Sequence, residues 1–349
     1  MKVAIATVQA PFVSGGAELH AENLKKALIS AGHEAEVVTM PFMDSPISLI
    51  ENHIIAARLM NLEHSWAGPI DLCIGLKFPA YYIPHPNKVI WALHQHRGAY
   101  DLFDTSFTNL KNDKDGRHIR SAVKNADNIY FKEAKRLYAN SQNVADRLKE
   151  YNNIDAKALY HPCPDMEQFF DGPYSDYILM PSRINITKRQ QLAVEALQYT
   201  KSGIKLYIMG RADHPHEKEK LVQRVNELGL SNRVKFLEFV PQKEKIKLYA
   251  NARGVLFIPQ DEDYGYITLE GMAASKAVIT AADSGGPLEF ILDGENGFIS
   301  EPEPLPLARA IDSLGYDKNV ARLMGQKAKQ RLKDMNISWE YVVKELTRV

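Results

Sequence analysis

The segment Val255–Ile299 decides the fold of this chain, and it runs VLFIPQDEDYGYITLEGMAASKAVITAADSGGPLEFILDGENGFI. Its apolar runs at 255–259 and 277–280 predict two buried strands, and each run is followed by a loop that opens a helix. In an open α/β sheet, ligands bind outside the carboxyl ends of the strands, at loops of this kind. The first loop carries Glu262 and the helix after it carries Glu270. The segment therefore predicts one half of a binding cleft.

Length and composition narrow the class of protein. At 349 residues the chain exceeds the roughly 250–300 residues at which single cores stop growing, so two domains are expected. Its 43 basic and 43 acidic residues give a net charge of zero, which argues against a nucleic-acid partner. Two cysteines, no signal-peptide pattern and no apolar run of about 18 residues favour a cytoplasmic protein without a membrane-spanning helix.

The beginning of the chain shows the same strand–loop–helix pattern. Residues 2–8 predict a buried strand, the loop Ser14-Gly15-Gly16 follows it, and an amphipathic helix extends to about Ala31. Glycine lets the backbone approach a phosphate, and the first N–H groups of a helix favour negative charge. The loop is therefore a candidate anion site, although a tight turn without a ligand has the same pattern.

A polar cluster follows the strand expected at 88–93. The cluster contains His94, His96 and Arg97. Polar side chains at the carboxyl end of a parallel strand face the cleft, which makes His94 a candidate site residue. No acidic residue or cysteine lies at ligand spacing from these histidines, so a metal site is not expected here.

Residues 113–150 are polar and predict mostly helix. Their basic side chains include Arg117, Arg120, Lys124, Lys132, Lys135, Arg136, Arg147 and Lys149. These charges fit solvated helix faces, and they also fit a surface for an anionic acceptor or for membrane headgroups. Peripheral contact with the inner face of a membrane is therefore left open.

A second α/β half begins after the proline-rich segment His161–Asp165, where we place the domain boundary. The strand that opens this half is followed by Arg183 and Lys188. The capping-box spacing between Thr187 and Gln190 predicts a helix from Lys188. Cations in a first helical turn oppose the helix dipole, and a bound anion would reverse that penalty. Two cations at this place predict a phosphate site, although two surface cations would show the same pattern.

Strands and helices alternate through both halves of the chain. Further elements are expected at 177–180, 205–209, 217–228, 234–236 and 242–251, and a helical segment follows from about 304. The chain is therefore expected to be α/β, with two doubly wound, Rossmann-like domains that face each other across a cleft. The expected domains are 1–165 and 166–330, followed by a helical segment at 331–349.

These residues resemble the retaining glycosyltransferases of family 4, which have the GT-B fold. The resemblance covers nearly the whole chain and is strongest from Tyr177 to Gly297. Its most specific mark is a pair of glutamates separated by seven residues, here Glu262 and Glu270. Between them stands Tyr264-Gly265-Tyr266, with Asp263 in place of the usual first glycine.

Other motifs extend the resemblance to both ends of the chain. The spacing of Arg183 and Lys188 matches the diphosphate-binding pair of the family, although Arg189 stands where glycine is commoner. Gly15-Gly16 with Glu18 resembles the N-terminal glycine loop, and Ser338-Trp339-Glu340 resembles the closing helix, which in this fold crosses back onto the first domain. The segments Gly285–Glu289 and Asp293–Gly297 also match closely.

The resemblance implies roles for the matching residues. Glu270 would accept hydrogen bonds from the ribose hydroxyls of a nucleotide, and Arg183 with Lys188 would hold its diphosphate. Gly15 and Gly16 would approach the diphosphate from the first domain. The remaining implied contacts are Glu262 and His94 near the donor sugar, and the N–H groups of Tyr264, Gly265 and Tyr266 on sugar or phosphate oxygens. His94, Glu262, Arg183 and Lys188 are thus the catalytic candidates.

The implied reaction moves a sugar, with retention, from a UDP- or GDP-sugar to a glycan or lipid-linked acceptor, as in polysaccharide biosynthesis. Negative charge builds on the departing nucleoside diphosphate, and fixed cations and helix N-termini stabilise it, so no metal or other cofactor is expected. Asp261-Glu262-Asp263 does resemble the Asp-x-Asp of metal-dependent transferases. Glu262 and Glu270 also resemble the carboxylate pair of a hydrolase.

Three other functions remain open at this stage. A nucleotide-sugar epimerase would act on the donor without an acceptor, and a non-catalytic nucleotide-sugar-binding protein of the same fold would turn nothing over. A nicotinamide-dependent dehydrogenase is disfavoured because the loop at Gly15-Gly16 lacks Gly-x-Gly-x-x-Gly. The base (UDP, GDP or ADP), the sugar and the acceptor are not predicted.

Overall fold

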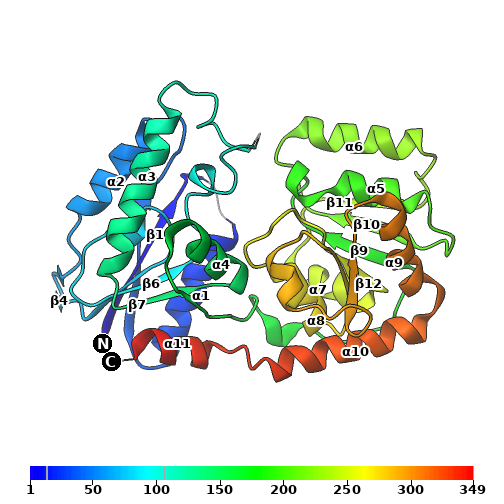
Figure 1. Cartoon of the computed structure of the whole chain (residues 1–349). Coiled ribbons are helices and arrows are strands. Elements are labelled where there is room, and N and C mark those ends of the chain that lie inside the picture. Colours follow the sequence, from blue (N-terminus) through cyan, green and yellow to red (C-terminus); the bar gives the residue numbers. More distant parts are fainter. Residues whose placement is uncertain (13–14, 106, 349) are drawn as a thin grey trace. The chain divides into compact units, whose positions relative to one another are not determined.

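The computed structural model describes residues 1–12, 15–105 and 107–348, so Ser14 of the expected glycine loop lies outside the described residues. The chain divides into two compact units. The first unit is Met1–Pro164 together with Ser338–Val349, and the second is Asp165–Ile337. Figure 1 shows that each unit has a sheet covered by helices.

The first unit is built on a parallel six-stranded sheet with the order β2-β1-β5-β6-β7-β8. Its strands are β1 (Lys2–Gln9), β2 (Glu34–Pro41), β5 (Leu72–Gly75), β6 (Lys88–Ala92), β7 (Arg136–Ala139) and β8 (Lys157–Ala158). A separate short hairpin joins β3 (His64–Ser65) and β4 (Gly68–Pro69). Six consecutive residues of β1 are buried, as expected for a strand covered on both faces.

Alternate residues of β1 point into two different cores because side chains alternate along a strand. Val3 and Ile5 lie in the core that contains residues of α1 (Gly16–Ser30) and α11 (Trp339–Thr347). Ala4 and Ala6 lie in the core on the other face. The helices of that second face are α2 (Leu49–Leu59), α3 (Gly116–Tyr130) and α4 (Gln142–Asn152). The first unit is thus a three-layer α/β/α domain.

The second unit has a parallel sheet with the order β11-β10-β9-β12-β13-β14. Its strands are β9 (Tyr177–Pro181), β10 (Lys205–Met209), β11 (Val234–Leu237), β12 (Gly254–Leu256), β13 (Val278–Ala281) and β14 (Gly297–Ser300). One core contains residues of α5 (Gln190–Leu197), α6 (Pro215–Glu227), α9 (Pro304–Tyr316) and the start of α10 (Lys318–Asp334). The remaining helices are α7 (Gln242–Asn251) and α8 (Tyr266–Ala273), and α8 packs on β12 and β13.

Short 3₁₀ helices complete the two units. They are η1 (Ala80–Tyr82), η2 (Arg97–Ala99), η3 (Phe131–Glu133), η4 (Met166–Gln168), η5 (Ile186–Lys188) and η6 (Gly286–Glu289). The expected α/β class with two doubly wound, Rossmann-like domains is confirmed. The bounds of β10 and α7 are those expected from the sequence.

One expectation about secondary structure is incomplete and another is wrong. Residues 113–150 are mostly helical, as expected, because they contain α3 and most of α4, but the unexpected strand β7 lies between these helices and pairs with both β6 and β8. The helix expected from Lys188 is only the 3₁₀ turn η5, which Asn185 caps by accepting a hydrogen bond from the N–H of Lys188. The α-helix itself begins two residues later, at Gln190, after Arg189 takes a left-handed conformation.

A buried aromatic cluster holds α11 on the first unit. The ring of Trp339 stacks on His161 at 5.7 Å, and His20 lies edge-on to both Trp91 and His161 at 4.4 and 4.3 Å. Among the described residues, neither ring nitrogen of His20 has a hydrogen-bond partner. Burial, with His161 beside it, holds the pKa of His20 well below its usual value, and burial lowers the pKa of His161 to about 3. Both rings are therefore neutral in the folded unit at neutral pH.

We expect this cluster to make the first unit less stable in mild acid. Above about pH 6.5, the usual pKa of histidine, the folded and unfolded forms are both neutral and stability is full. As the pH falls from there toward about 3, the unfolded chain binds protons that the folded unit does not. Each such histidine costs about 1.4 kcal/mol of unfolding free energy per pH unit.

Urea unfolding between pH 7 and 5 measures this loss, and His20→Phe should reduce its slope by one histidine's share. The exposed His64, changed to Phe, is the control and should leave the slope as in the wild type. Equal slopes in wild type and His20→Phe would contradict the prediction.

Other features of the fold bear on the sequence predictions. No helix in the described part of the chain is both long and apolar enough to span a bilayer. Cys73 and Cys163 are buried and are not joined in a disulfide.

Candidate functional site

The order of the strands marks one place in the second unit where a ligand fits. The chain goes from β9 to β10 on one side and later returns to β12 on the other side of β9. In doubly wound sheets the crevice at such a reversal, outside the carboxyl ends of the strands, is where ligands bind. The loops that follow β9 and β12 here are Ser182–Arg189 and Phe257–Gly265.

Backbone hydrogen bonds join these loops to each other and to the loop after β13. The N–H of Gln260 donates to the carbonyl of Thr187 at 2.8 Å, which links the loops after β9 and β12. Glu262 donates its N–H to Ser284 and accepts from the N–H of Gly286, both at 2.8 Å. The three loops therefore form one rigid edge, which suits a site that must be preorganised.

Lys188 and Glu262 meet at this edge. The ammonium group of Lys188 donates a hydrogen bond to Oε2 of Glu262 and lies 5.5 Å from the centre of the Phe257 ring. The exposed fractions of the two side chains are 16% and 29%, so the pair is partly shielded from water. Because the two residues are 74 positions apart in sequence, only the fold brings them together.

Arg183 is more exposed and has a different partner. Its side chain is 69% exposed, and Nη1 donates to Oδ1 of Asp213 at 2.9 Å. Asn185 donates to the other oxygen of Asp213, also at 2.9 Å. Asp213 thus ties the loop after β9 to the loop after β10 and holds Arg183 at the carboxyl edge of the sheet.

Arg189 explains why glycine is commoner at its position. Its φ is +57°, a left-handed conformation that costs free energy for any residue with a side chain. Its guanidinium donates two hydrogen bonds of 2.6 Å to the two oxygens of Asp283. This bidentate pair connects the start of α5 to the loop after β13 and offsets the strained backbone.

Glu270 lies on α8 and is 6% exposed. Its Oε1 accepts a hydrogen bond from the ammonium of Lys245 at 2.7 Å, and its Oε2 accepts one from the hydroxyl of Tyr249 at 2.5 Å. Lys245 and Tyr249 are one turn apart on α7, so they present both groups from one helix face. The lysine charge compensates the buried carboxylate, and each oxygen still has a second lone pair for a ligand hydroxyl.

The start of α8 depends on glycines at close contacts. Gly265 has a φ of +91°, and a Cβ there would come within 3.0 Å of Phe257 and Pro287. A Cβ on Gly286 would lie 2.7 Å from the carbonyl oxygen of Tyr264. Tyr264 is buried against Phe290, while Tyr266 is the first residue of α8. The first N–H groups of α8 therefore lie at the same edge as the three loops.

The first unit places its candidate residues after β1 and β6. Gly15 precedes the first residue of α1, Gly16, and its N–H donates to Oε2 of Glu18 at 2.7 Å. The carboxylate of Glu18 thus lies at the helix N-terminus, where negative charge is favoured. His94 follows β6 and is half-buried, and its Nδ1 lies 2.6 Å from the carbonyl oxygen of Gln95.

Comparison with known proteins relates the second unit to a protein family. A sequence model described as "Glycosyl transferases group 1" matches residues 168–331, which is nearly the whole of the second unit. The second unit is therefore similar to this family over nearly its whole length. The matched segment contains the loops after β9, β12 and β13 and all of the site residues described in the second unit.

The similar proteins include mannosyltransferases. This chain is 34% identical over 128 residues to the alpha-1,3/1,6-mannosyltransferase ALG2 of Dictyostelium discoideum. That match covers 37% of this chain and 30% of the relative, so the chain matches less than a third of the relative's length. An uncharacterized glycosyltransferase of Methanocaldococcus jannaschii is 26% identical over all of this chain and 97% of its own.

Solved structures share the fold. The Anabaena protein HepE, in complex with UDP and glucose, superposes with a TM-score of 0.72 at 20% identity. The superposition covers 99% of this chain and 98% of HepE. The GT-B fold expected from the sequence is confirmed.

The sequence did not reveal several partners of the predicted residues. These are Lys245 and Tyr249 on Glu270, Asp213 on Arg183 and Asp283 on Arg189. The spacing of Lys245 and Tyr249 could have shown that they share one face of α7, but not that this face meets α8. The Asp261-Glu262-Asp263 segment is not part of a cluster of three or more metal-ligating side chains among the described residues. Metal independence stays a prediction.

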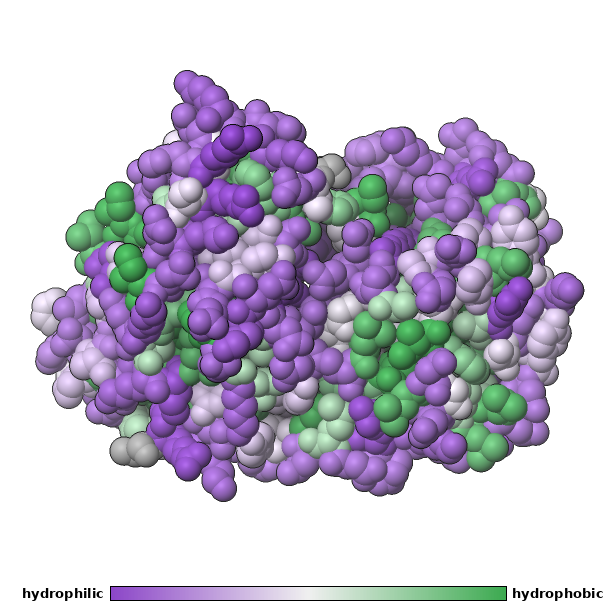
Figure 2. Space-filling view, in the orientation of Figure 1, coloured by the Kyte–Doolittle hydropathy of each residue, from purple (hydrophilic) through white to green (hydrophobic). Residues whose placement is uncertain are grey.

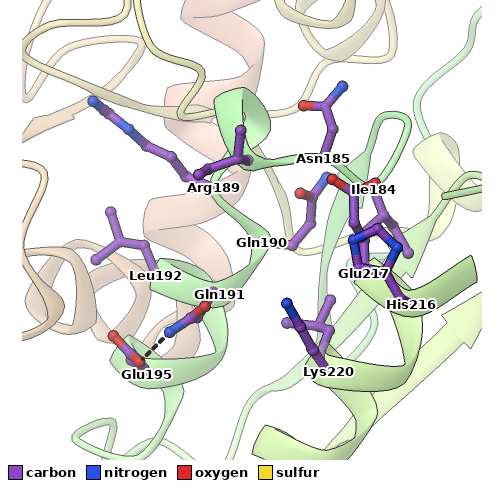
Figure 3. Close-up of a pocket in the computed structure, with 12 residues that line it drawn as sticks. Ile184, Asn185, Arg189, Gln190, Gln191, Leu192, Glu195, His216, Glu217 and Lys220 are labelled. Atoms are coloured by element: carbon purple, nitrogen blue, oxygen red, sulfur yellow. Dashed lines mark hydrogen bonds between the residues drawn. The ribbon is translucent and has the colours of Figure 1, made fainter. Parts of the chain in front are cut away.

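A pocket of about 570 Å³ is lined partly by the loop after β9 and partly by α5 and α6 (Figure 3). It is formed by Ile184–Ile186, Arg189, the first turns of α5 and the first turns of α6. Neither Arg183 nor Lys188 lines it. In Figure 3 the side chain of Arg189 points away from His216 and Lys220. The pocket is therefore distinct from the groups expected to hold a diphosphate.

Proposed function

We propose that this chain transfers a sugar, with retention, from a UDP- or GDP-sugar to an acceptor hydroxyl without a metal ion. The observation that supports this most is the arrangement at the reversal of the second sheet. Lys188 and Arg183 follow β9 there, and Glu270 lies on α8, the next helix after β12. Two cations with a shielded carboxylate suit a diphosphate joined to a ribose.

The proposed reaction breaks the bond between the anomeric carbon and a diphosphate oxygen. The acceptor oxygen forms the new bond to that carbon and loses its proton, and the nucleoside diphosphate departs with an added negative charge. Lys188 and Arg183 would stabilise this charge, with Glu262 and His94 near the sugar. HepE was solved with UDP and glucose, and ALG2 is named a mannosyltransferase, which supports a nucleotide-sugar donor.

A thermal-shift panel tests the proposal. UDP, GDP, ADP, their common sugar conjugates and NAD are each added with and without magnesium. A ligand at 100 times its dissociation constant adds roughly 2.7 kcal/mol of stability, which is a readable shift. We expect one nucleoside diphosphate to stand out without magnesium. A shift with NAD alone, or a flat panel, would overturn the proposal, while consumption of donor without any acceptor would favour an epimerase.

Replacing Glu270 by glutamine should weaken binding of that nucleotide. The amide keeps the shape of the side chain but has no negative charge to pair with Lys245. It also lacks the carboxylate oxygen that accepts from Tyr249 and that would accept from a ribose hydroxyl. Loss of a charged hydrogen bond costs about 1–3 kcal/mol. Isothermal titration with the nucleotide and its 2′-deoxy form measures it, and the variant should no longer distinguish the two. Tyr249→Phe is the control, because it leaves the carboxylate in place.

We further propose a glycan or lipid-linked acceptor and peripheral contact of the first unit with a membrane. The basic residues of 113–150 support this less than expected, because Arg136 donates to the carbonyl of Leu346 and Arg147 is buried. Exposed apolar side chains support it more. Ile55 and Leu59, one turn apart on α2, are 57% and 80% exposed, and Figure 2 shows apolar atoms over this helix.

Changing Ile55 and Leu59 together to serine should therefore reduce sedimentation with vesicles of anionic lipid. Apolar side chains that enter the headgroup layer gain about 25 cal/mol for each Å² removed from water, and serine forfeits this gain. The control is the same double change to serine at Leu305 and Leu323, which are exposed on the second unit. Equal sedimentation of both double variants would refute membrane contact through α2.

A further inference from the structure

A buried hydrogen-bond network begins at the carboxyl end of β6, in the first unit. It joins side chains from the loop after β6, from α3 and from α4. Its members are His94, Gln95, Tyr100, Asp127 and Asn152. Gln95 is 2% exposed, Tyr100 is 3% exposed and Asp127 is fully buried, so water has little access to these groups.

The network starts at the imidazole of His94. Its Nδ1 lies 2.6 Å from the carbonyl oxygen of Gln95. A carbonyl oxygen only accepts hydrogen bonds, so Nδ1 must carry the hydrogen. In the neutral ring Nε2 then carries none, and the contact with Gln95 decides which tautomer His94 adopts.

Gln95 is held in place by α4. Its side-chain amide donates to Oδ1 of Asn152, the last residue of that helix. Asn152 in turn donates from Nδ2 to the hydroxyl oxygen of Tyr100 at 3.1 Å and to Oδ1 of Asn128 at 2.8 Å. The residue that follows His94 is therefore tied through its side chain to a helix and not only to its own loop.

Asp127 ends the network. Its Oδ2 accepts a hydrogen bond of 2.6 Å from the hydroxyl of Tyr100, and its Oδ1 accepts from Tyr81 and Tyr82 at 3.0 and 2.7 Å. Because the hydrogen of Tyr100 goes to Asp127, its oxygen accepts from Asn152. From the side chain of Gln95 one line of donations thus runs through Asn152 and Tyr100 to the carboxylate, and bonds aligned in this way polarise and strengthen one another.

We propose that Gln95 and Asn152 are positioning residues that hold the ring of His94 in its Nδ1–H tautomer and fix its orientation. Asp127 and Tyr100 anchor them. The inference deepens the proposed function, since it concerns the residue expected beside the donor sugar, and it rests on that function for its effect on turnover. The tautomer itself is a property of the free protein and is independent of any reaction.

Nuclear magnetic resonance of protein labelled with ¹⁵N-histidine reads the tautomer directly, without a ligand. The signals of His94 are those lost in His94→Gln. The wild type should show a protonated Nδ1 and an unprotonated Nε2. Gln95→Met and Asn152→Ala should each shift this population toward the Nε2–H form, and the double variant should be no further shifted, because both act through one carbonyl.

Asn87→Ala is the matched control, since it also removes an amide hydrogen bond, to the carbonyl of Asp71, but at the amino end of β6. It should leave the signals of His94 unchanged. Gln95→Met and Asn152→Ala should also be assayed with the donor found by the thermal-shift panel. Each should lower kcat by up to about 100-fold, because a site group misplaced by about 1 Å can cost that much, and KM should change little.

Two results would overturn the inference: an Nε2–H tautomer in the wild type, or wild-type signals in the folded Gln95→Met variant. Gln95→Met has a side chain of similar length, so it keeps the test valid if Asn152→Ala does not fold. If the wild type shows the Nδ1–H tautomer but transfers no sugar, the proposed function fails and the positioning role stands.

Discussion

Replacing Asp127 by alanine should destabilise the first unit by at least about 3 kcal/mol, because a lost acceptor leaves each buried donor unsatisfied at about 1–3 kcal/mol. Three tyrosine hydroxyls, from Tyr81, Tyr82 and Tyr100, donate to this one carboxylate. Tyr81 and Tyr82 are fully buried and Tyr100 nearly so, and water therefore does not replace the lost acceptor. The free energy of urea unfolding, followed by tryptophan fluorescence, measures the loss.

Two variants separate the lost hydrogen bonds from other effects of the change. Asp127→Asn keeps the shape and one acceptor oxygen, so its loss should be clearly smaller. Asp115→Ala removes an exposed carboxylate at the start of the same helix, where its side chain makes no capping hydrogen bond, and should be nearly neutral. A loss below 1 kcal/mol in Asp127→Ala would show that the tyrosines find other partners.

The sequence predicted the elements whose pattern is local. The apolar run of β10 and the polar-apolar alternation of α7 are complete within their own residues, and their bounds were predicted correctly. β7 was missed because it is four residues long, begins with Arg136 and lies between two polar helices. Its place in the sheet is supported from far away, since the hydroxyl of Tyr138 donates to the carbonyl of Glu345, 207 positions later.

The residues of the site were predicted, but their contacts were not. Their places after predicted strands and the resemblance to family 4 pointed to Glu262, Glu270, Arg183 and Lys188, but could not show which groups these residues contact. Arg189 ends the 3₁₀ turn in a left-handed conformation that Asp283, 94 residues away, helps to stabilise. The capping-box pattern was therefore misleading, because a contact between distant residues overrode a local preference.

Replacing Lys188 by alanine should lower turnover of the donor by about 10²- to 10³-fold, the usual effect of removing one group that stabilises developing negative charge. The structure adds a second cause. Lys188 donates to Glu262, so its loss removes the positive charge beside this carboxylate at the edge where the diphosphate is expected. The carboxylate would then repel the departing phosphate, and the effect on kcat should exceed the effect on binding of a nucleoside without phosphates.

Steady-state kinetics of three variants separate these two causes. Lys188→Ala combined with Glu262→Gln removes the repulsion, so it should recover part of the binding of the nucleoside diphosphate without recovering kcat fully. Lys218→Ala is the matched control, because it breaks another lysine–glutamate pair of the second unit, with Glu238, on a more exposed surface. Wild-type turnover in Lys188→Ala would remove this residue from the leaving-group site. If the double variant binds the nucleoside diphosphate no better than Lys188→Ala does, Glu262 lies away from the diphosphate, as expected of a group that contacts only the sugar.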